Sequence, residues 1–180
     1  LAMGTIGSEA NIIDGYNVLH AHPALGPALR DDLDAARARL VAELAGFAQG
    51  GPRTIVVFDG AGNPASDGAP HHLGSLTVIF SKAGVSADTV IEGLARRFRE
   101  RGERAVVVTS DVATRDTVFS GSVSVLAAAT FVDELAVEAE RRIESATVPR
   151  RVPVSQRIDA NVGAMLARWV RGDVSMQKDD

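Results

Sequence analysis

The sequence contains no cysteine among its 180 residues. This absence excludes disulfide bonds, cysteine-ligated zinc sites and thiol nucleophiles, and it fits a protein of the reducing cytoplasm. Aromatic residues are also scarce, at 4% of the chain, whereas hydrophobic residues make up 46%. We therefore expect a soluble globular protein whose core is filled by Val, Leu, Ile and Ala side chains.

Long hydrophobic runs and a positive overall charge are missing as well. No apolar stretch approaches the roughly 18 residues that a membrane-spanning helix needs, which predicts no membrane partner. Residues 1–10 have neither the basic nor the hydrophobic segment of a signal peptide, so we interpret them as a flexible leader or vector-derived residues. The formal net charge is −4, and lysine occurs only at Lys82 and Lys178, so arginine supplies most of the positive charge.

Four short runs are continuously apolar and rich in β-branched residues. Such runs, bounded by Gly, Pro or charged residues, predict strands of a parallel sheet that is covered on both faces. A fifth candidate, residues 122–128, is weaker because its polar and apolar residues alternate. The four runs are residues 11–14, 54–59, 76–81 and 105–111.

Helical patterns alternate with these strands. Ser86 is a plausible N-cap of the second helix, and Thr130 and Asp133 open the third with capping-box-like spacing. Strands that alternate with helices predict right-handed βαβ units and a three-layer α/β/α domain with a mainly parallel central sheet. The predicted helices span residues 29–50, 86–102, 130–146 and 158–172.

The chain length suits one domain. We expect residues 11–148 to form it, with 149–180 as a linker and a C-terminal helical appendage that packs on the same domain. Residues 59–74 are too polar and too rich in Gly and Pro for a helix, so they predict a long loop, and long loops are often functional or mobile.

Aspartates stand at the ends of three predicted strands, at Asp14, Asp59 and Asp111. A fourth, Asp88, lies in the first turn of the helix that follows the third strand. Ligands of open parallel sheets bind outside the carboxyl ends of the strands. We therefore expect these four acids to converge at one edge of the sheet.

Such a cluster of like charges is unfavourable unless a cation compensates it. Mg²⁺ and Mn²⁺ prefer carboxylate ligands, and they activate water and stabilise the charge on a phosphoryl group. The cluster therefore predicts phosphodiester hydrolysis. Each acid alone has a structural explanation, because Asp-Gly is a turn signal and Asp88 suits a helix N-terminus. The convergence of all four favours a site.

Several neighbours of these acids have more than one interpretation. Glu92 lies one turn after Asp88 and either joins the site or is exposed on the helix. Asn17 either braces the loop around Asp14 or contacts a phosphate. The hydroxyl of Ser110 orients a carboxylate, contacts substrate or satisfies a backbone group.

Several other chemistries lack their motifs. The sequence has no GxGxxG after a strand, no Walker A motif and no GxSxG elbow. An aspartyl-nucleophile phosphatase would need a second Asp two residues after Asp14, where this chain has Tyr16. A histidine zinc site is not expected, because the histidines occur in predicted loops, at His20, His22, His71 and His72.

Five separated segments together resemble the YacP-like NYN domain ribonucleases, a branch of the PIN-like (Rossmannoid) fold. They are "IIDGYNVL", "VVFDG", "VIFSKAGVSADTVIE", "VVTSD" and the final "ARWVRGD", so the similarity covers nearly the whole chain. The resemblance implies a metal-dependent endoribonuclease with RNA as its partner. Some bacterial members act on mRNA at the ribosome, which makes ribosome-bound mRNA one implied substrate.

The resemblance also implies roles for single residues. Asn17 matches the asparagine of the family motif, and Lys82 matches a basic position, so it is either a phosphate contact or a solvated lysine. Asp116 is a candidate for a further acid by position only. The implied metal-binding acids are Asp14, Asp88 and Asp111, with Asp59 nearby.

Arginine clusters and one aromatic residue are further candidates for RNA contacts. Arg96, Arg97, Arg150 or Arg151 would bind RNA if they flank the acids, although an arginine-rich helix face is usually only solvated. Tyr16 lies beside Asp14 and either stacks on a base or packs in the fold.

Three hypotheses follow from the sequence. The first is a Mg²⁺- or Mn²⁺-dependent endoribonuclease that uses Asp14, Asp88 and Asp111. The second is a non-catalytic RNA- or ribosome-binding module that retains the PIN-like fold. The third, a small-molecule phosphatase, is the weakest.

Overall fold

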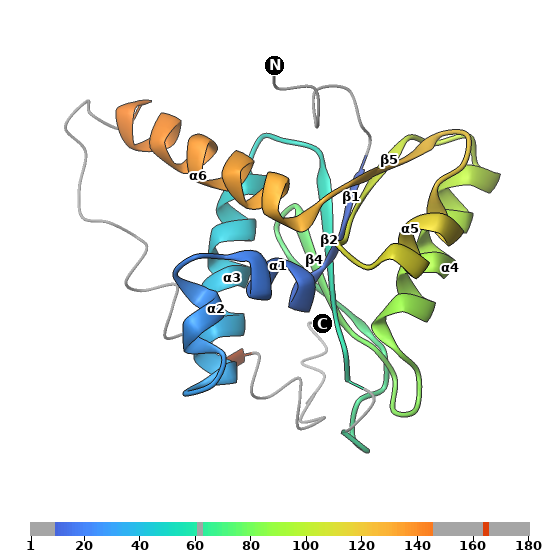
Figure 1. Cartoon of the computed structure of the whole chain (residues 1–180), viewed down its shortest axis with the longest axis horizontal. Coiled ribbons are helices and arrows are strands. Elements are labelled where there is room, and N and C mark those ends of the chain that lie inside the picture. The colour runs from blue at the N-terminus through green and yellow to red at the C-terminus, as the bar shows by residue number, and fades with distance from the viewer. Residues whose placement is uncertain (1–9, 61–62, 146–163, 166–180) are drawn as a thin grey trace, which may run out of the picture.

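The computed structural model describes residues 10–60, 63–145 and 164–165. A six-stranded sheet with the strand order β3-β4-β2-β1-β5-β6 forms its centre (Figure 1). All neighbouring strands pair in parallel except β3, which runs antiparallel to β4. The strands are β1 (Ala10–Asp14), β2 (Arg53–Phe58), β3 (Pro70–Leu73), β4 (Leu76–Phe80), β5 (Ala105–Val108) and β6 (Val123–Leu126).

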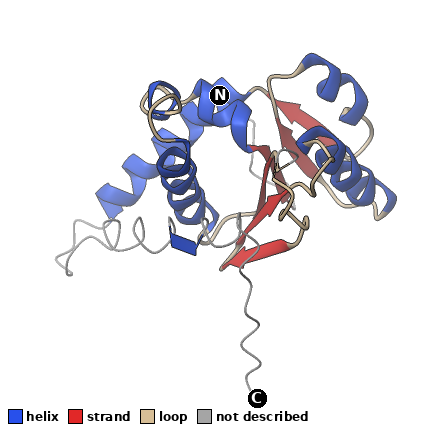
Figure 2. Cartoon of the chain, turned by 90° about the horizontal axis from the view of Figure 1, so that it is seen from below, coloured by secondary structure: helices blue, strands red, loops and turns tan. Residues whose placement is uncertain are grey.

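Helices cover both faces of this sheet, which confirms the predicted three-layer α/β/α architecture (Figures 1 and 2). Four helices lie on one face, namely α1 (Gly15–Ala21), α2 (Leu25–Ala28), α3 (Leu33–Ala48) and α6 (Ala128–Ser145). The other face carries α4 (Ala87–Glu100) and α5 (Val112–Val118).

Strand β1 shows why the central strands read as continuous apolar runs. All five of its residues are buried, because helices pack on both faces of the strand. Ile13 belongs to the larger core cluster, beneath α1, α3 and α6, whereas Ile12 belongs to the smaller cluster beneath α4. Alternate residues of one strand thus hold the two helical layers together.

Strand β3 lies inside the segment that the sequence predicts to be a loop. It pairs with β4 alone, at the edge of the sheet, and its residues alternate between exposed and half-buried. No hydrophobic run marks such a strand, because hydrogen bonds to β4 rather than burial define it. His71 and His72 therefore lie on a strand, and His20 lies in α1, so the prediction that they occupy loops is wrong.

Three short helices, α1, α2 and α5, are absent from the sequence prediction. The sequence after Asp14 was interpreted as a turn, but Asp14 caps α1, and Asp111 likewise caps α5. Ser86 caps α4 as predicted. The capping pair predicted at Thr130 and Asp133 is wrong, because α6 already begins at Ala128.

Both predicted terminal segments fall largely outside the described residues. Within the first, Ala10 is already the first residue of β1 rather than part of a leader. Within the second, only Ala164 and Met165 are described; both are helical, and Met165 packs against the larger core cluster. The packing of the rest of residues 149–180 stays a prediction. In the part of the chain that the structure describes, no helix is long and apolar enough to cross a membrane.

Candidate functional site

The carboxyl ends of the parallel strands meet at one edge of the sheet, here called the acid edge. Asp14 is the last residue of β1, and Asp59 follows β2 directly. Asp111 follows β5 after two residues, and Asp88 lies in the first turn of α4, which begins after β4. The chain therefore brings all four predicted acids to this edge, although only the contacts decide which of them interact.

Asp14 is the buried acid of the site, with 4% of its surface exposed. Its Oδ1 accepts a hydrogen bond of 3.1 Å from the backbone N–H of Asn17, and the side-chain amide of Asn17 donates to its Oδ2. Burial raises the pKa of Asp14, and the negative charge of Asp88 raises it further, while the hydrogen bonds from Asn17 oppose the shift. The protein alone therefore stabilises the ionised form of this carboxylate poorly. A bound cation would stabilise it.

Asn17 links three separate segments at the acid edge. Its side-chain carbonyl accepts a hydrogen bond of 3.1 Å from the backbone N–H of Ser110. The hydroxyl of Ser110 in turn accepts a bond of 3.2 Å from the backbone N–H of Ala128, at the start of α6. The chain of contacts Asp14–Asn17–Ser110–Ala128 joins β1, α1, the β5–α5 loop and α6. Both predicted substrate contacts, Asn17 and Ser110, therefore also hold the fold together.

Asp111 is exposed, and its carboxylate is engaged with its own helix. Its Oδ2 accepts a hydrogen bond of 2.7 Å from the backbone N–H of Thr114, which lowers the pKa of Asp111. The hydroxyl of Thr109 accepts a bond of 3.1 Å from the backbone N–H of Asp111 and fixes the loop. Asp111 thus stays ionised at neutral pH without help from a cation, in contrast to Asp14.

The chemistry of these groups fits a hard divalent cation in part. Asp14 and Asp88 are a pair of interacting carboxylates, and Mg²⁺ is commonly held by one or two carboxylates together with retained waters. Within residues 10–60, 63–145 and 164–165, however, no three acidic or histidine side chains are grouped so that they could hold one ion. The participation of Asp111 in a metal site therefore stays a prediction.

A serine pair shapes the acid edge beside Asp59 and Lys82, both of which are exposed. The backbone N–H of Gly60 donates to the hydroxyl of buried Ser81 over 2.9 Å, and the hydroxyl of buried Ser66 donates to the Ser81 carbonyl over 2.7 Å. These bonds fasten the β2–β3 loop onto the residue that precedes Lys82. Neither serine could be predicted as part of the site, because nothing in their spacing shows that the β2–β3 loop folds back onto Ser81.

Tyr16 is engaged in packing, and its partner is an arginine that the sequence analysis did not select. The ring packs edge-on against Phe58 with centroids 5.7 Å apart. Its hydroxyl accepts hydrogen bonds from the guanidinium of Arg37, one of them from Nε over 2.9 Å. Arg37 also lies over the ring and pairs with Asp34 over 2.7 Å. These contacts anchor the first turn of α1. They favour the interpretation in which Tyr16 packs in the fold over the one in which it stacks on a base.

The remaining candidates lie along α4 and α5, or outside the described residues. Arg96 is eight residues beyond Asp88, roughly 12 Å along α4, and it pairs with Glu100 over 3.8 Å. Arg97 adjoins it, so both arginines lie toward the opposite end of α4 rather than around the acids. Glu92 is half-buried one turn after Asp88. Asp116 is exposed on α5, whereas Arg150 and Arg151 lie outside the described residues.

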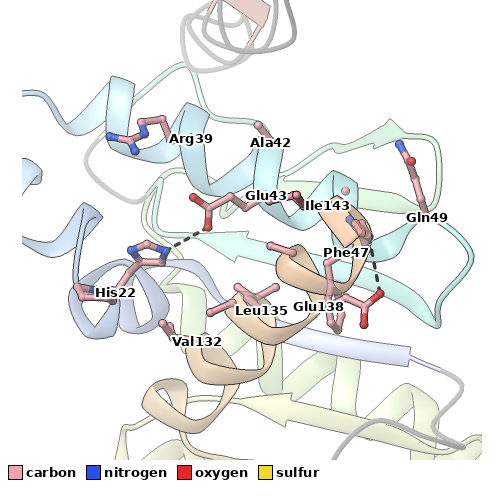
Figure 3. Close-up of a pocket in the computed structure, with 15 residues that line it drawn as sticks. His22, Arg39, Ala42, Glu43, Phe47, Gln49, Val132, Leu135, Glu138 and Ile143 are labelled. Carbon is pink, nitrogen blue, oxygen red and sulfur yellow. Dashed lines mark hydrogen bonds and ion pairs between the residues drawn. The ribbon is translucent and has the colours of Figure 1, made fainter. Parts of the chain in front are cut away.

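A concave surface lies between α3 and α6, and none of the predicted site residues lines it (Figure 3). This groove of about 850 Å³ is lined mainly by apolar side chains, among them Phe47, Val132 and Leu135. His22 and Glu43, which both line it, form a side-chain hydrogen bond of 3.1 Å. Because none of the predicted site residues lines it, the groove is not part of the acid edge.

Comparison with known proteins agrees with the fold described above. A model of the YacP-like NYN domain matches residues 11–171. The chain is 28% identical over 169 residues to "Uncharacterized protein YacP" of Bacillus subtilis (strain 168), which covers 91% of this chain and 97% of that protein.

Solved structures of Rae1 (YacP) from Bacillus subtilis are similar to the whole domain. A tryptophan-to-leucine variant superposes with a TM-score of 0.62 at 25% identity, covering 87% of this chain and 99% of that one. A second Rae1 structure gives a TM-score of 0.56 at 26% identity, covering 91% and 95% of the two chains. NYN domains are generally nucleases. The chain therefore belongs to the YacP-like NYN domain family and has its PIN-like fold.

Proposed function

We propose that this protein is a divalent-cation-dependent endoribonuclease whose active site is the acid edge. The observation that carries the proposal is the buried carboxylate of Asp14, whose pKa is raised by burial and by the charge of Asp88. A buried acid beside a second acid suits a cation-binding position better than a structural one. Membership of a family whose domains are generally nucleases supports the same class of reaction.

Each residue of the acid edge has a distinct part in this proposal. Asp14 and Asp88 would hold Mg²⁺ or Mn²⁺, and Asp111 would join them if its side chain turned away from α5. The bound ion supplies Lewis-acid stabilisation of the phosphoryl group and lowers the pKa of water. Asn17 hydrogen-bonds to the Asp14 carboxylate and would fix its orientation, and exposed Lys82 would contact a phosphate.

The substrate and setting extend the same proposal. RNA is the substrate that the family resemblance implies, with ribosome-bound mRNA as one form of it. A cytoplasmic location is consistent with that substrate and with the absence of cysteine.

RNA cleavage by matched variants tests the proposal. The wild type should cleave end-labelled RNA with Mg²⁺ or Mn²⁺ and not with EDTA. Asp14→Asn and Asp88→Asn should reduce the rate by about 100-fold or more, because even the partners of metal ligands contribute about 10- to 100-fold. Glu140→Gln removes an equal charge from an exposed position of α6 and serves as the control. Equal cleavage by the wild type, Asp14→Asn and Asp88→Asn would refute the proposal.

The grouping of the acids favours a second candidate, a non-catalytic RNA-binding module. In the described part of the chain no three acidic or histidine side chains form a metal-binding group, and this alternative needs none. It predicts salt-sensitive RNA binding that survives Asp14→Asn, with no cleavage in Mg²⁺ or Mn²⁺. Turnover of a simple phosphate ester without RNA cleavage would instead indicate a phosphatase.

A further inference from the structure

The edge of the sheet opposite the acids, here called the amino edge, brings two turns together. The α4–β5 turn covers residues 101–104, and the α5–β6 turn covers residues 119–122. The backbone N–H of Ala105 donates to the carbonyl of Ser122 over 3.2 Å, and Ala105 pairs with Val123 between β5 and β6. The two turns therefore lie side by side, as the neighbouring ends of α4 and α5 in Figure 1 also show.

Exposed arginines at this edge have no ionic partner in the described part of the chain. Arg101 is the C-cap of α4, Arg104 precedes β5, and Arg97 lies one turn before Arg101 on the same helix. The structure records no ion pair for any of the three within residues 10–60, 63–145 and 164–165.

The neighbouring acids interact with other arginines. Glu100 pairs with Arg96 over 3.8 Å, and Glu103 pairs with Arg53 over 3.4 Å. Positive charge therefore accumulates at this edge of a chain whose formal net charge is −4. A local excess of arginine against an acidic background is the pattern expected where a polyanion binds.

An exposed aromatic ring belongs to the same edge. Phe119, the C-cap of α5, keeps 69% of its surface exposed. The other aromatic side chains in the described part of the chain are buried or half-buried. An exposed Phe at the same edge as these arginines does not serve the core, but it offers a surface on which a base could stack.

We propose that Arg97, Arg101, Arg104 and Phe119, here called the amino-edge surface, bind single-stranded RNA. Arginines that contact phosphates and an aromatic ring that stacks on a base are the features by which proteins hold single strands. The choice of RNA rests on the proposed function. Asp88 and Arg101 are thirteen residues apart on α4, roughly 20 Å, so the amino-edge surface would hold a part of the strand distant from the acids.

Fluorescence anisotropy with a labelled, unstructured 20-nucleotide RNA in EDTA measures this binding without cleavage. The variant Arg101→Ala/Arg104→Ala should reduce the slope of log affinity against log salt by about 1.4, at about 0.7 for each lost phosphate contact. Phe119→Ala should weaken binding about tenfold and leave the salt slope unchanged, because stacking releases no counterions. Arg39→Ala, an exposed arginine on α3, is the matched control and should bind like the wild type.

Thermal unfolding establishes that the variants are folded. We expect them to fold because Arg101, Arg104 and Phe119 are exposed. Wild-type affinity in both amino-edge variants would overturn the inference, as would absence of RNA binding by the wild type or an equal loss in Arg39→Ala. Binding to anionic phosphatidylglycerol vesicles that depends on Phe119 and that RNA does not displace would also overturn it.

Cleavage measured in parallel separates this inference from the proposed function. If RNA binding depends on the amino-edge surface but the wild type cleaves no RNA, the inference stands and the nuclease proposal fails. If cleavage depends on Asp14 but the amino-edge variants bind RNA with wild-type affinity, only the inference fails. If both stand, Phe119→Ala should raise KM for the 20-nucleotide RNA and leave kcat unchanged.

Discussion

Asp14 serves the fold and the proposed reaction with the same carboxylate. It caps α1 through the backbone N–H of Asn17, yet burial and the charge of Asp88 raise its pKa. Asp111 is an N-cap as well, but it is exposed, and its hydrogen bonds lower its pKa. Of these two caps, only Asp14 holds a carboxylate whose charge the protein stabilises poorly.

Gly15 allows the close approach that places Asp14. A Cβ atom at this position would lie 2.4 Å from the ring of buried Phe58. Gly15→Ala should therefore destabilise the protein by about 1–3 kcal/mol through overpacking, as measured by urea unfolding. Gly93→Ala in α4 is the control, because its Cβ would meet no atom within 4 Å of the described structure and the change should stabilise by up to about 1 kcal/mol. Equal stability changes of the same sign would contradict this account.

The acids could be predicted from sequence because strand ends and helix starts fix which edge they occupy. Asp14 and Asp88 meet for that reason. Arg37, Ser66 and Ser81 could not be predicted, because each acts through a partner distant in the chain. Arg37 reaches Tyr16 across 21 positions, and Ser66 reaches Ser81 across 15.

At the scale of helices and strands, the well-buried elements could be predicted from the sequence, and the partly buried or short ones could not. The central strands and the long amphipathic helices were predicted to within a few residues, because helices cover both faces of the strands. Strand β3 was missed because it lies at an edge and is only partly buried. Helices α1 and α5, of seven residues each, are too short to show a helical period, and their caps were interpreted as turn residues.

Helix α6 carries a half-buried acid that makes stability depend on pH. Burial raises the pKa of Glu134 above its ordinary value of 4.5, and its Oε2 has no hydrogen-bond partner in the described part of the chain. Ionisation of Glu134 therefore lowers the free energy of unfolding. The stability that the protonated Glu134 contributes is complete below pH 4.5 and is lost as the pH rises through the folded-state pKa.

Glu134→Gln should consequently stabilise the protein more, relative to wild type, at pH 7 than at pH 4. Urea unfolding at both pH values measures the difference, and Glu140→Gln at an exposed position of α6 corrects for the lost charge. The same difference between variant and wild type at pH 4 and pH 7 would contradict the assignment.

At the scale of the whole molecule, the parallel sheet separates two chemically different edges. Acids gather where the strands end, and exposed arginines and Phe119 gather where β5 and β6 begin. Helix α4 joins these edges, with Asp88 in its first turn and Arg101 at its C-cap. A strand of RNA that contacted both edges would be held at one and cleaved at the other.

Binding of Mn²⁺ to the RNA-free protein tests the central claim, that the acid edge holds a cation, most directly. Calorimetric titration of the wild type should show saturable binding. Asp14→Asn and Asp88→Asn should each weaken it by at least about tenfold, whereas Glu140→Gln, at an exposed position of α6, should leave it unchanged. Asp111→Asn reports in the same experiment whether the third acid takes part. Mn²⁺ affinity that is absent in the wild type, or equal in the wild type, Asp14→Asn and Asp88→Asn, would contradict the account.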